Sequence, residues 1–437
     1  MAIRLCTSNI SERTYAHELH LERSEDLDRG YYIVNLKDVE YKVDLWRRSC
    51  PRVQPFYAVK CNDDLAVLAV LAHAGVNFDC ASKAEIAKVL SLGVAPSRII
   101  YAHPIKAPSY LRYAMKHHVR RMTFDCVEEL HKIAEIYPEA QCVLRLKVDD
   151  SESDFKLSQK FGCSEEDCVR CLQEAHKLGL EVIGVSFHVG CNNQSPYAYS
   201  NALAFARRAC DFGEKIGFRM KFVDIGGGYP GYHGFEPIFE KTSNAINAAL
   251  DMHFPRGQGF EIISEPGTFF VSSAFTLCAR IIGKKATATT PDLAKTSDAV
   301  AMQYYVNDSV YKSFNISFFT DACVSPLCLE DDKVSGELLE TIIWGNTCDG
   351  VDKIKKSCLL PELEVGDWLM FDSLGAYSTT LETPFNGMEA PEKYYMSSPE
   401  ISEMFKSMTV YEDKEDVAYV HRHFSLTGQA QCLRQAA

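Results

Sequence analysis

Short apolar runs alternate with amphipathic stretches from about residue 53 to residue 267. The stretches between the runs, such as DDLAVLAVLAHAG and CVEELHKIAEI, are apolar at helical spacing. The runs that read as strands are VQPFYAVK, VNFDCAS, RIIYAHP, RRMTFDC, QCVLRLKV, VIGVSFHVG, KFVDIGGG and FEIISEPG. Strands that alternate with helices predict an α/β fold with a parallel sheet, and eight such strands predict a (β/α)8 barrel.

The pattern changes after about residue 274. FTLCARIIGKKA, AMQYYVNDSVYKSFNISFF, LETIIWG and DWLMFDSLGAYS read as strands with turns between them, which predicts a C-terminal β-rich domain. YYIVNL lies too early to begin the barrel, and we expect it to pair with this second domain. The predicted domains are a barrel at 36–274, a β-rich domain at 1–35 and 275–411, and a polar tail at 412–437.

Composition limits the kinds of partner that the protein can bind and the cellular compartment in which it is expected. Lys and Arg number 46 against 59 Asp and Glu, a formal net charge of −13 that disfavours a general binder of nucleic acid or of an anionic membrane. The chain shows no signal-peptide core and no run of about 18 apolar residues, so we expect no membrane span. Its 17 cysteines lie scattered through apolar stretches, which indicates free thiols in a reducing, cytoplasmic location and no metal site.

Residues that could take part in catalysis or ligand binding lie at the C-terminal ends of the apolar runs. They are Lys60, Asp79, His103, Asp125, Arg145, His188, Gly226 to Gly228 and Glu265. Barrel enzymes place their active sites on this face, because strand ends are rigid and their loops converge there. A charged residue at a strand end can also be merely solvated, and Asp125 alone could be structural. The occurrence of such residues at the ends of all eight predicted strands favours an active site.

Residues 226–231, GGGYPG, match the GxGxxG pattern of dinucleotide-binding sites. That site needs a helix that opens at the glycines, and Pro230 followed by glycine opposes one. Two alternatives remain open. The loop either offers backbone N–H groups to a single phosphate or is a tight turn without a ligand.

Three of the strand-end residues, Lys60, His188 and Glu265, suggest a cofactor. In a barrel mouth Lys60 would be desolvated, which lowers the pKa of its amine and makes it nucleophilic; an ion pair with Asp79 or Glu85 is the alternative. Glu265 would keep a pyridine nitrogen protonated, and His188 would stack on the ring. Together with a glycine loop for the phosphate, these groups are what pyridoxal 5'-phosphate requires.

Seven motifs carry a resemblance to a known family: PFYAVKCN, FDCASKAEI, SFHVG, DIGGGYPG, YVNDSVYKSFN, WGNTCDGVD and GAYS. Over about residues 31–404 the chain resembles the eukaryotic ornithine decarboxylase family of fold type III enzymes, and within it the mammalian ornithine-decarboxylase-like leucine decarboxylases. The resemblance implies an alanine-racemase-like barrel with a C-terminal β domain, pyridoxal phosphate as cofactor, an amino-acid substrate and a homodimer with shared active sites.

The same resemblance implies roles for individual residues. Lys60 would be the Schiff-base lysine, and Cys348 would reprotonate the substrate carbon in the neighbouring subunit's site. The residues expected to bind the cofactor are Lys60, Asp79, Glu85, Arg145, His188, Cys191, Gly226, Gly227, Gly228, Glu265, Gly267, Thr268 and Tyr377. Those expected to contact the substrate are Thr320, Asp349 and Phe385. The expected intersubunit salt bridges join Lys160 to Asp352 and Asp125 to Lys285.

Three of these positions depart from the family pattern. Thr268 stands in EPGT where the family has an arginine that pairs with the phosphate, and Cys191 stands where it has a phosphate-binding serine. Both changes weaken phosphate binding without removing the carbon chemistry. Thr320 replaces the acidic residue that binds the substrate's distal ammonium, and Asp321 would point to the opposite face of a strand.

The third departure bears on the substrate. A buried ammonium without a carboxylate partner is costly, so Thr320 favours a neutral aliphatic amino acid, most of all leucine, over ornithine or lysine. Asp349 is retained, so a basic substrate is disfavoured but not excluded. The resemblance therefore predicts a decarboxylase that releases CO2 from leucine, with an ornithine or lysine decarboxylase as the alternative.

A second alternative is a weakly active or inactive regulator, because the family includes antizyme inhibitors. Residues 106–132 align with the family's antizyme-binding element, so antizyme is a possible partner. The basic side chains of this segment are Lys106, Arg112, Lys116, Arg120, Arg121 and Lys132. A solvated helix face explains these charges equally well. The retained Lys60 and Cys348 favour the enzyme.

Overall fold

The computed structural model describes residues 2–22, 29–193, 195, 197–286, 302–318, 324–414, 417–423 and 425–429. The chain divides into two compact units. The first, which we call the barrel unit, comprises 39–270 and 409–423. The second, which we call the sheet unit, comprises 1–38, 271–408 and 424–437.

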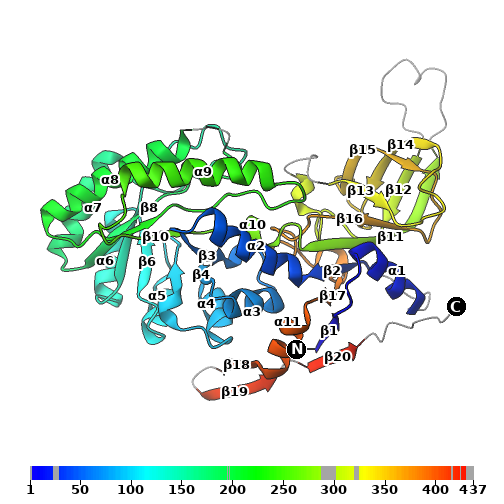
Figure 1. Cartoon of the computed structure of the whole chain (residues 1–437), viewed down its shortest axis with the longest axis horizontal. Coiled ribbons are helices and arrows are strands. Elements are labelled where there is room, and N and C mark those ends of the chain that lie inside the picture. Colours follow the sequence, from blue (N-terminus) through cyan, green and yellow to red (C-terminus); the bar gives the residue numbers. More distant parts are fainter. Residues whose placement is uncertain are drawn as a thin grey trace. The chain divides into compact units, whose positions relative to one another are not determined.

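The barrel unit is built on eight parallel strands that close in the order β10-β3-β4-β5-β6-β7-β8-β9 (Figure 1). Their bounds are β3 Gln54–Ala58, β4 Asn77–Cys80, β5 Ile99–Tyr101, β6 Arg121–Phe124, β7 Gln141–Arg145, β8 Glu181–Ser186, β9 Phe222–Asp224 and β10 Glu261–Ser264. Phe56, Val143 and Phe222 belong to one apolar cluster that fills the core. Each of the eight predicted runs forms a barrel strand, so the predicted fold class is confirmed.

Helices connect the barrel strands and cover their outer side (Figure 1). They are α2 Leu36–Ser49, α3 Leu65–His73, α4 Lys83–Leu90, α5 Pro108–Lys116, α6 Val127–Ile136, α7 Glu165–Lys177, α8 Ala198–Ile216 and α9 Glu236–His253. Side-chain caps set where two of them begin. Asp64 accepts hydrogen bonds from the first amides of α3, and Ser82 does so for α4. Cys168 and Cys171 are buried on α7, where they take part in helix packing.

The sheet unit contains a ten-stranded sheet whose main path is β15-β14-β12-β11-β2-β17-β1-β20, with β16 paired to β11 and β13. The strands are β1 Ala2–Cys6, β2 Tyr31–Asn35, β11 Phe275–Ala286, β12 Met302–Val306, β13 Pro326–Cys328, β14 Leu338–Trp344, β15 Lys353–Pro361, β16 Trp368–Phe371, β17 Glu392–Met396 and β20 Ser425–Gln429. The helices are α1 Glu12–Glu22 and α11 Pro399–Ser407. Strand β2 pairs with β11 and β17, which confirms that YYIVNL joins the second domain.

Three strands lie near the C-terminus, partly within the segment where the sequence analysis expected a polar tail. Strands β18 Thr409–Lys414 and β19 Val417–His423 form an antiparallel pair, and β20 pairs with β1. The sequences TVYEDK and VAYVHRH contain β-branched and aromatic residues between polar ones, a pattern that favours strands.

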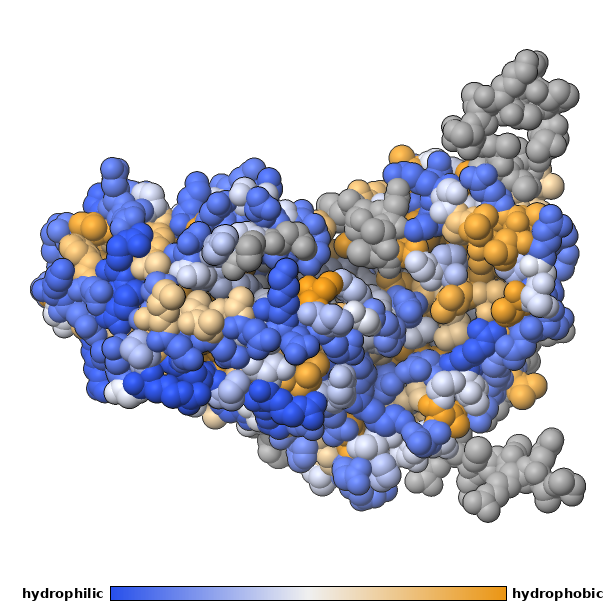
Figure 2. Space-filling model, turned by 45° about the horizontal axis from the view of Figure 1, so that its top comes forward, coloured by the Kyte–Doolittle hydropathy of each residue, from blue (hydrophilic) through white to orange (hydrophobic). Residues whose placement is uncertain are grey.

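The visible surface is mostly hydrophilic, with apolar side chains gathered over part of the sheet unit (Figure 2). Exposed apolar residues of the sheet unit include Leu338 on β14 and Leu359 on β15. Within the described ranges, no helix combines the length and the apolar character that a membrane crossing requires.

Candidate active site

The rim of the barrel gathers the residues that the sequence analysis assigned to strand ends. Lys60 follows β3, Asp79 lies in β4, Arg145 ends β7, His188 follows β8, Gly226 to Gly228 follow β9, and Glu265 follows β10. Because the strands are parallel, these ends meet at one rim. The charges of Lys60 and Arg145 affect the ionisation of Asp79, His188 and Glu265. These residues therefore form one electrostatically connected site.

Lys60 and Asp79 form an ion pair between the end of β3 and strand β4. The Asp79 side chain is fully buried, whereas 41% of the Lys60 side chain is exposed. The expected desolvation of Lys60 is therefore wrong for this chain, and the alternative ion pair is what forms. Burial raises the pKa of Asp79 to about 7, the negative charge of Glu265 adds to this, and Lys60 opposes it. Lys60 is thus paired with a buried carboxyl group in the cofactor-free chain.

Glu265 and Asp224 are neighbouring buried carboxyl groups. Burial raises the pKa of Glu265 well above its usual value, and the charge of Asp224 raises it further. Burial also raises the pKa of Asp224 to about 6. Asp224 Oδ1 accepts a hydrogen bond from Gly226 N at 2.9 Å. Asp224 was not among the predicted site residues, although its place at the end of KFVD, shortly before the glycines, was the available signal.

His188 presents a neutral ring to the site. Burial lowers its pKa to about 3, and the positive charges of Arg145 and Lys60 act in the same direction. Its Nδ1 accepts a hydrogen bond from Gly190 N at 3.1 Å, so the ring proton resides on Nε2. A neutral imidazole fixed in this way suits the predicted stacking on a pyridine ring.

The glycine loop after β9 packs directly on its neighbours. Gly226 and Gly228 have φ values of +70° and +93°, which favour glycine. A Cβ atom on Gly227 would lie 2.3 Å from the carbonyl oxygen of Glu265. Helix α9 begins only at Glu236, so the dinucleotide interpretation of GGGYPG does not apply.

Two neutral side chains border this loop. Cys191 lies against it, because a Cβ atom on Gly228 would be 3.0 Å from Cys191 Cα. Burial raises the pKa of the Cys191 thiol to about 11, so the thiol is uncharged. Thr268 begins the short helix α10, Thr268–Val271, directly after Gly267. Neither Cys191 nor Thr268 offers a positive charge to a phosphate.

Glu85 supports the turn between β4 and α4. Its Oε2 accepts a hydrogen bond from Ala81 N at 2.6 Å, while Ser82 Oγ accepts one from Glu85 N at 3.2 Å. Burial raises the pKa of Glu85 to about 7. The two hydrogen bonds hold the segment that directly follows Asp79.

The remaining candidates lie in the sheet unit. Cys348 is exposed, and its backbone N–H donates to Asn386 Oδ1 at 3.1 Å. The Tyr311 hydroxyl donates to Asp349 Oδ2 and lowers the pKa of that carboxyl. The rings of Tyr311 and Phe385 are 4.5 Å apart. The structure thus brings Cys348, Asp349 and Phe385 into one cluster with Tyr311, which the sequence analysis quoted in a motif without giving it a role.

Tyr377 and Thr320 are the other two predicted site residues that follow the barrel in the sequence. Tyr377 lies in the sheet unit with φ at +54°, a backbone conformation that is uncommon outside glycine. Thr320, on which the substrate prediction rests, lies outside the described residues.

The predicted intersubunit salt bridges involve groups that have partners in their own chain. Asp352 is buried, and its carboxylate accepts hydrogen bonds from Thr347 and from Val310 N at 3.0 Å. Asp125 Oδ2 accepts from Gly162 N at 2.8 Å. The pairs with Lys160 and Lys285 stay predictions.

The basic segment 106–132 is only partly a solvated face. Lys106 is fully buried and pairs with Glu129 at 2.8 Å, and Lys132 pairs with the same carboxylate at 2.5 Å. Arg121 forms two hydrogen bonds with Glu261, at 2.7 and 2.9 Å. The expectation of a basic surface is therefore wrong for Lys106, because its ammonium group contributes to barrel packing. The exposed basic side chains are Arg112, Lys116 and Arg120.

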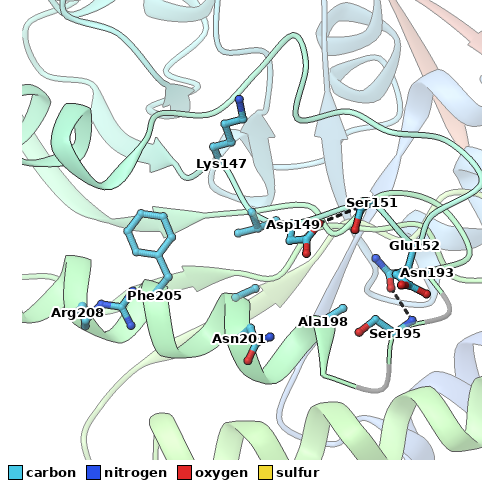
Figure 3. A pocket seen from close by; sticks show the side chains of 12 residues that line it. Lys147, Asp149, Ser151, Glu152, Asn193, Ser195, Ala198, Asn201, Phe205 and Arg208 are labelled. Atoms are coloured by element: carbon cyan, nitrogen blue, oxygen red, sulfur yellow. Dashed lines mark hydrogen bonds between the residues drawn. The ribbon is translucent and has the colours of Figure 1, made fainter.

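A pocket of about 170 Å³ lies between the segment after β7 and helix α8 (Figure 3). Polar side chains dominate its wall, with Lys147, Asp149 and Asn201 among them. Asp149 accepts from Ser151 N at 2.9 Å, a hydrogen bond drawn in Figure 3. The predicted cofactor residues do not line this pocket, so it is distinct from the candidate site.

The rim residues fit pyridoxal phosphate. Three buried carboxyl groups, Asp79, Asp224 and Glu265, outnumber the two nearby cations, so a protonated ring nitrogen would relieve their repulsion. Asp79 Oδ1 and Asp224 Oδ2 are buried without a hydrogen-bond partner among the described residues. With the amine of Lys60 and the ring of His188, the site contains the groups that this cofactor needs.

Comparison with known proteins agrees with this arrangement. Residues 36–272 match the family described as "Pyridoxal-dependent decarboxylase, pyridoxal binding domain". The chain is 44% identical over 388 residues to ornithine decarboxylase of Rattus norvegicus, covering 88% of this chain and 84% of that protein. It is 42% identical over 376 residues to antizyme inhibitor 2 of Xenopus laevis, covering 86% and 82%. The structure of arginine decarboxylase of Paramecium bursaria Chlorella virus bound to agmatine superposes with a TM-score of 0.81 at 35% identity, covering 88% of this chain and 100% of that one.

The family match covers more than half of the chain and includes every rim residue described above. The barrel, the paired lysine and the buried carboxyl groups are consistent with it. The chain belongs to the pyridoxal-dependent decarboxylases, carboxy-lyases whose cofactor is pyridoxal 5'-phosphate.

Proposed function

We propose that this decarboxylase acts on a neutral aliphatic amino acid, most of all leucine, and releases CO2 and the corresponding amine. The observation that carries the proposal is Thr320, at the position where the resembling family has the acidic residue for a distal ammonium. The two decarboxylases among the named relatives act on ornithine and arginine, which are basic amino acids. An uncompensated buried ammonium costs roughly 3–5 kcal/mol. An isobutyl group in the same pocket carries no such cost.

Asp349 offers limited compensation for the missing carboxylate at position 320. Its Oδ2 accepts the Tyr311 hydroxyl, and its Oδ1 accepts Val351 N at 3.1 Å. These hydrogen bonds compete with an ammonium for the carboxylate oxygens. A basic substrate would therefore have to displace interactions that already exist within the chain.

The proposed chemistry assigns a task to each rim residue. Lys60 would hold the cofactor through its amine, and Asp79, with its pKa near 7, would take up the proton that this amine gives up. Glu265 would pair with the ring nitrogen of the cofactor, and His188 would stack on its ring. When bound, pyridoxal phosphate accepts the electron pair that the departing carboxylate leaves behind. The exposed thiol of Cys348 returns a proton to the substrate carbon.

The proposal extends to the assembly. Because the Cys348 cluster belongs to the sheet unit and Lys60 to the barrel unit, we propose a homodimer in which one protomer supplies Lys60 and its partner supplies Cys348. The fifteen cysteines of the described ranges are free thiols, which supports a reducing, cytoplasmic location.

The decisive experiment is kcat/KM for leucine, ornithine and lysine with the wild type, Thr320→Asp and the uncharged control Thr320→Asn. We expect leucine to be preferred by on the order of a hundredfold. Thr320→Asp should shift the preference toward ornithine, and Thr320→Asn should not. Wild-type preference for ornithine or lysine would refute the proposed substrate. Equal ratios in the two variants would refute the role of the charge.

A second candidate function is an antizyme-inhibitor-like regulator, favoured by the similarity to antizyme inhibitor 2 and by the uncharged Cys191 and Thr268. Binding of purified antizyme tests it. Loss of binding in Arg112→Glu, with binding kept in the control Arg208→Glu on α8, would support this function. Strong CO2 release without antizyme binding would exclude it.

A further inference from the structure

A short chain of buried hydroxyl groups ends at the glycine loop. The Ser264 hydroxyl donates to the carbonyl oxygen of Gly226 at 2.5 Å. Because a serine hydroxyl has one proton, the contact of 2.9 Å between Tyr229 and Ser264 must be donated by Tyr229. Tyr229 and Ser264 are both buried, with exposed fractions of 2% and 0%.

The Gly226 peptide is fixed from several sides. Its carbonyl also accepts from Glu265 N at 2.8 Å, and its N–H donates to Asp224 Oδ1 at 2.9 Å. The hydroxyl chain therefore acts at a peptide that joins the glycine loop to Asp224 and Glu265.

Packing alone does not explain the Tyr229 hydroxyl. The ring packs edge-on against Trp46 at 5.1 Å and lies parallel to Tyr199 at 6.1 Å. A phenylalanine ring would make the same contacts. Burying a hydroxyl costs free energy unless it is hydrogen-bonded, and the Tyr229 hydroxyl interacts with the side chains of Ser264 and Tyr199. The contact with Ser264 is the one that connects it to the glycine loop.

We propose that Ser264 and Tyr229 are positioning residues for the cofactor phosphate, acting through the conformation of Gly226 to Gly228. The inference rests on the proposed phosphate role of these glycines. The neutral Cys191 and Thr268 leave the backbone of the loop with a larger share of the phosphate contacts. Small shifts of that backbone then have a larger effect on affinity than they would beside an arginine.

The test measures the dissociation constants of pyridoxal phosphate and of pyridoxal, which lacks the phosphate, by fluorescence titration of the purified protein. Loss of one hydrogen bond of about 1 kcal/mol corresponds to a roughly fivefold change. We expect Ser264→Ala and Tyr229→Phe each to weaken pyridoxal phosphate by about threefold to tenfold and to leave pyridoxal unchanged. In the double variant, Tyr229→Phe should add nothing, because the Tyr229 hydroxyl reaches the Gly226 carbonyl through Ser264.

The control is Tyr304→Phe, which removes a buried, hydrogen-bonded hydroxyl from β12 of the sheet unit and should leave both affinities unchanged. Unchanged affinity for pyridoxal phosphate in Tyr229→Phe, or equal losses for both ligands, would overturn the proposal. If Ser264→Ala does not fold, the result for Tyr229→Phe alone tests the proposal. This variant keeps the aromatic ring and therefore its packing. A wild type that binds pyridoxal as tightly as pyridoxal phosphate would instead refute the phosphate role of the glycines.

Discussion

At the scale of single residues, three carboxyl groups buried close together determine the ionisation of the barrel rim. Asp79, Asp224 and Glu265 repel one another, and burial favours their protonated forms. Lys60 and Arg145 oppose this shift at Asp79 and Glu265. A cationic cofactor ring nitrogen would act in the same direction, so binding of the cofactor and ionisation of these carboxyl groups are linked.

Lys60→Ala should abolish tight cofactor binding and activity, because none of the other predicted cofactor-binding residues carries a primary amine. The measurement is the visible absorption of the purified protein after incubation with pyridoxal phosphate and dialysis. Lys88→Ala is the matched control, since Lys88 is also an ion-paired lysine of the barrel unit, with Asp63 as its partner. A yellow, active Lys60→Ala protein would contradict the assignment.

His188 should contribute a pH-dependent part of the stability of the cofactor-free protein. Its folded pKa of about 3 lies below the value of 6.5 for an unperturbed histidine, so the unfolded chain binds the extra proton between these values. Its contribution is present above about pH 6.5 and is lost as the pH falls toward 3.

His188→Phe should therefore flatten the rise of Tm over this range, measured by calorimetry. Asp79, whose folded pKa is raised, contributes the opposite slope between about pH 4 and 7, so Asp79→Asn should steepen the rise. An unchanged profile in His188→Phe would show that the ring is not buried in its neutral form.

At the scale of elements, two loops frame the predicted phosphate position. The β9–α9 loop supplies glycines that pack against Glu265, and the β10–α10 connection supplies Gly267 and Thr268. A Cβ atom on Gly267 would lie 2.8 Å from Cys61 Cβ, which ties this connection to the segment that carries Lys60. The two loops thus relate the phosphate position to the reactive amine.

Thr268→Arg should tighten pyridoxal phosphate, because a charged, bidentate donor replaces a hydroxyl. Such a contact is worth roughly 1.5–3 kcal/mol, or about a tenfold or larger decrease in the dissociation constant. Thr268→Gln, which has similar length without charge, should change the affinity much less. An equal affinity for the cofactor in wild type and Thr268→Arg would contradict the prediction that threonine at position 268 weakens phosphate binding.

At the scale of the whole molecule, candidate residues belong to two compact units. The barrel unit carries Lys60 and the buried carboxyl groups, and the sheet unit carries Cys348 and Asp349. The proposed shared site requires a residue from each unit, contributed by different protomers.

Mixing inactive Lys60→Ala with inactive Cys348→Ala should restore part of the decarboxylase activity, because mixed dimers contain one intact site. The control mixes Lys60→Ala with the double variant Lys60→Ala/Cys348→Ala, which cannot rebuild a site. Subunit exchange is verified with differently tagged chains. Exchange without any recovery would rule out a site shared between protomers.

The sequence by itself determined the barrel and the positions of its rim residues. Periodicity and strand-end polarity are local properties, so VQPFYAVK and FEIISEPG could be assigned to strands without knowing what lies between them. The pairing of YYIVNL with the second domain could also be predicted from the sequence. This strand lies before the alternating strands and helices that form the barrel. Motif resemblance then indicated the cofactor.

Only the tertiary structure decided which charges meet. The ion pair of Lys60 with Asp79, the closeness of Asp224 to Glu265 and the two hydrogen bonds between Arg121 and Glu261 join different strands of the barrel. Burial of Lys106 likewise depends on Glu129, which lies on α6. Ionisation depends on the distance between charges and on their access to water. Neither quantity is a local property of the chain, and both arise only when the barrel closes.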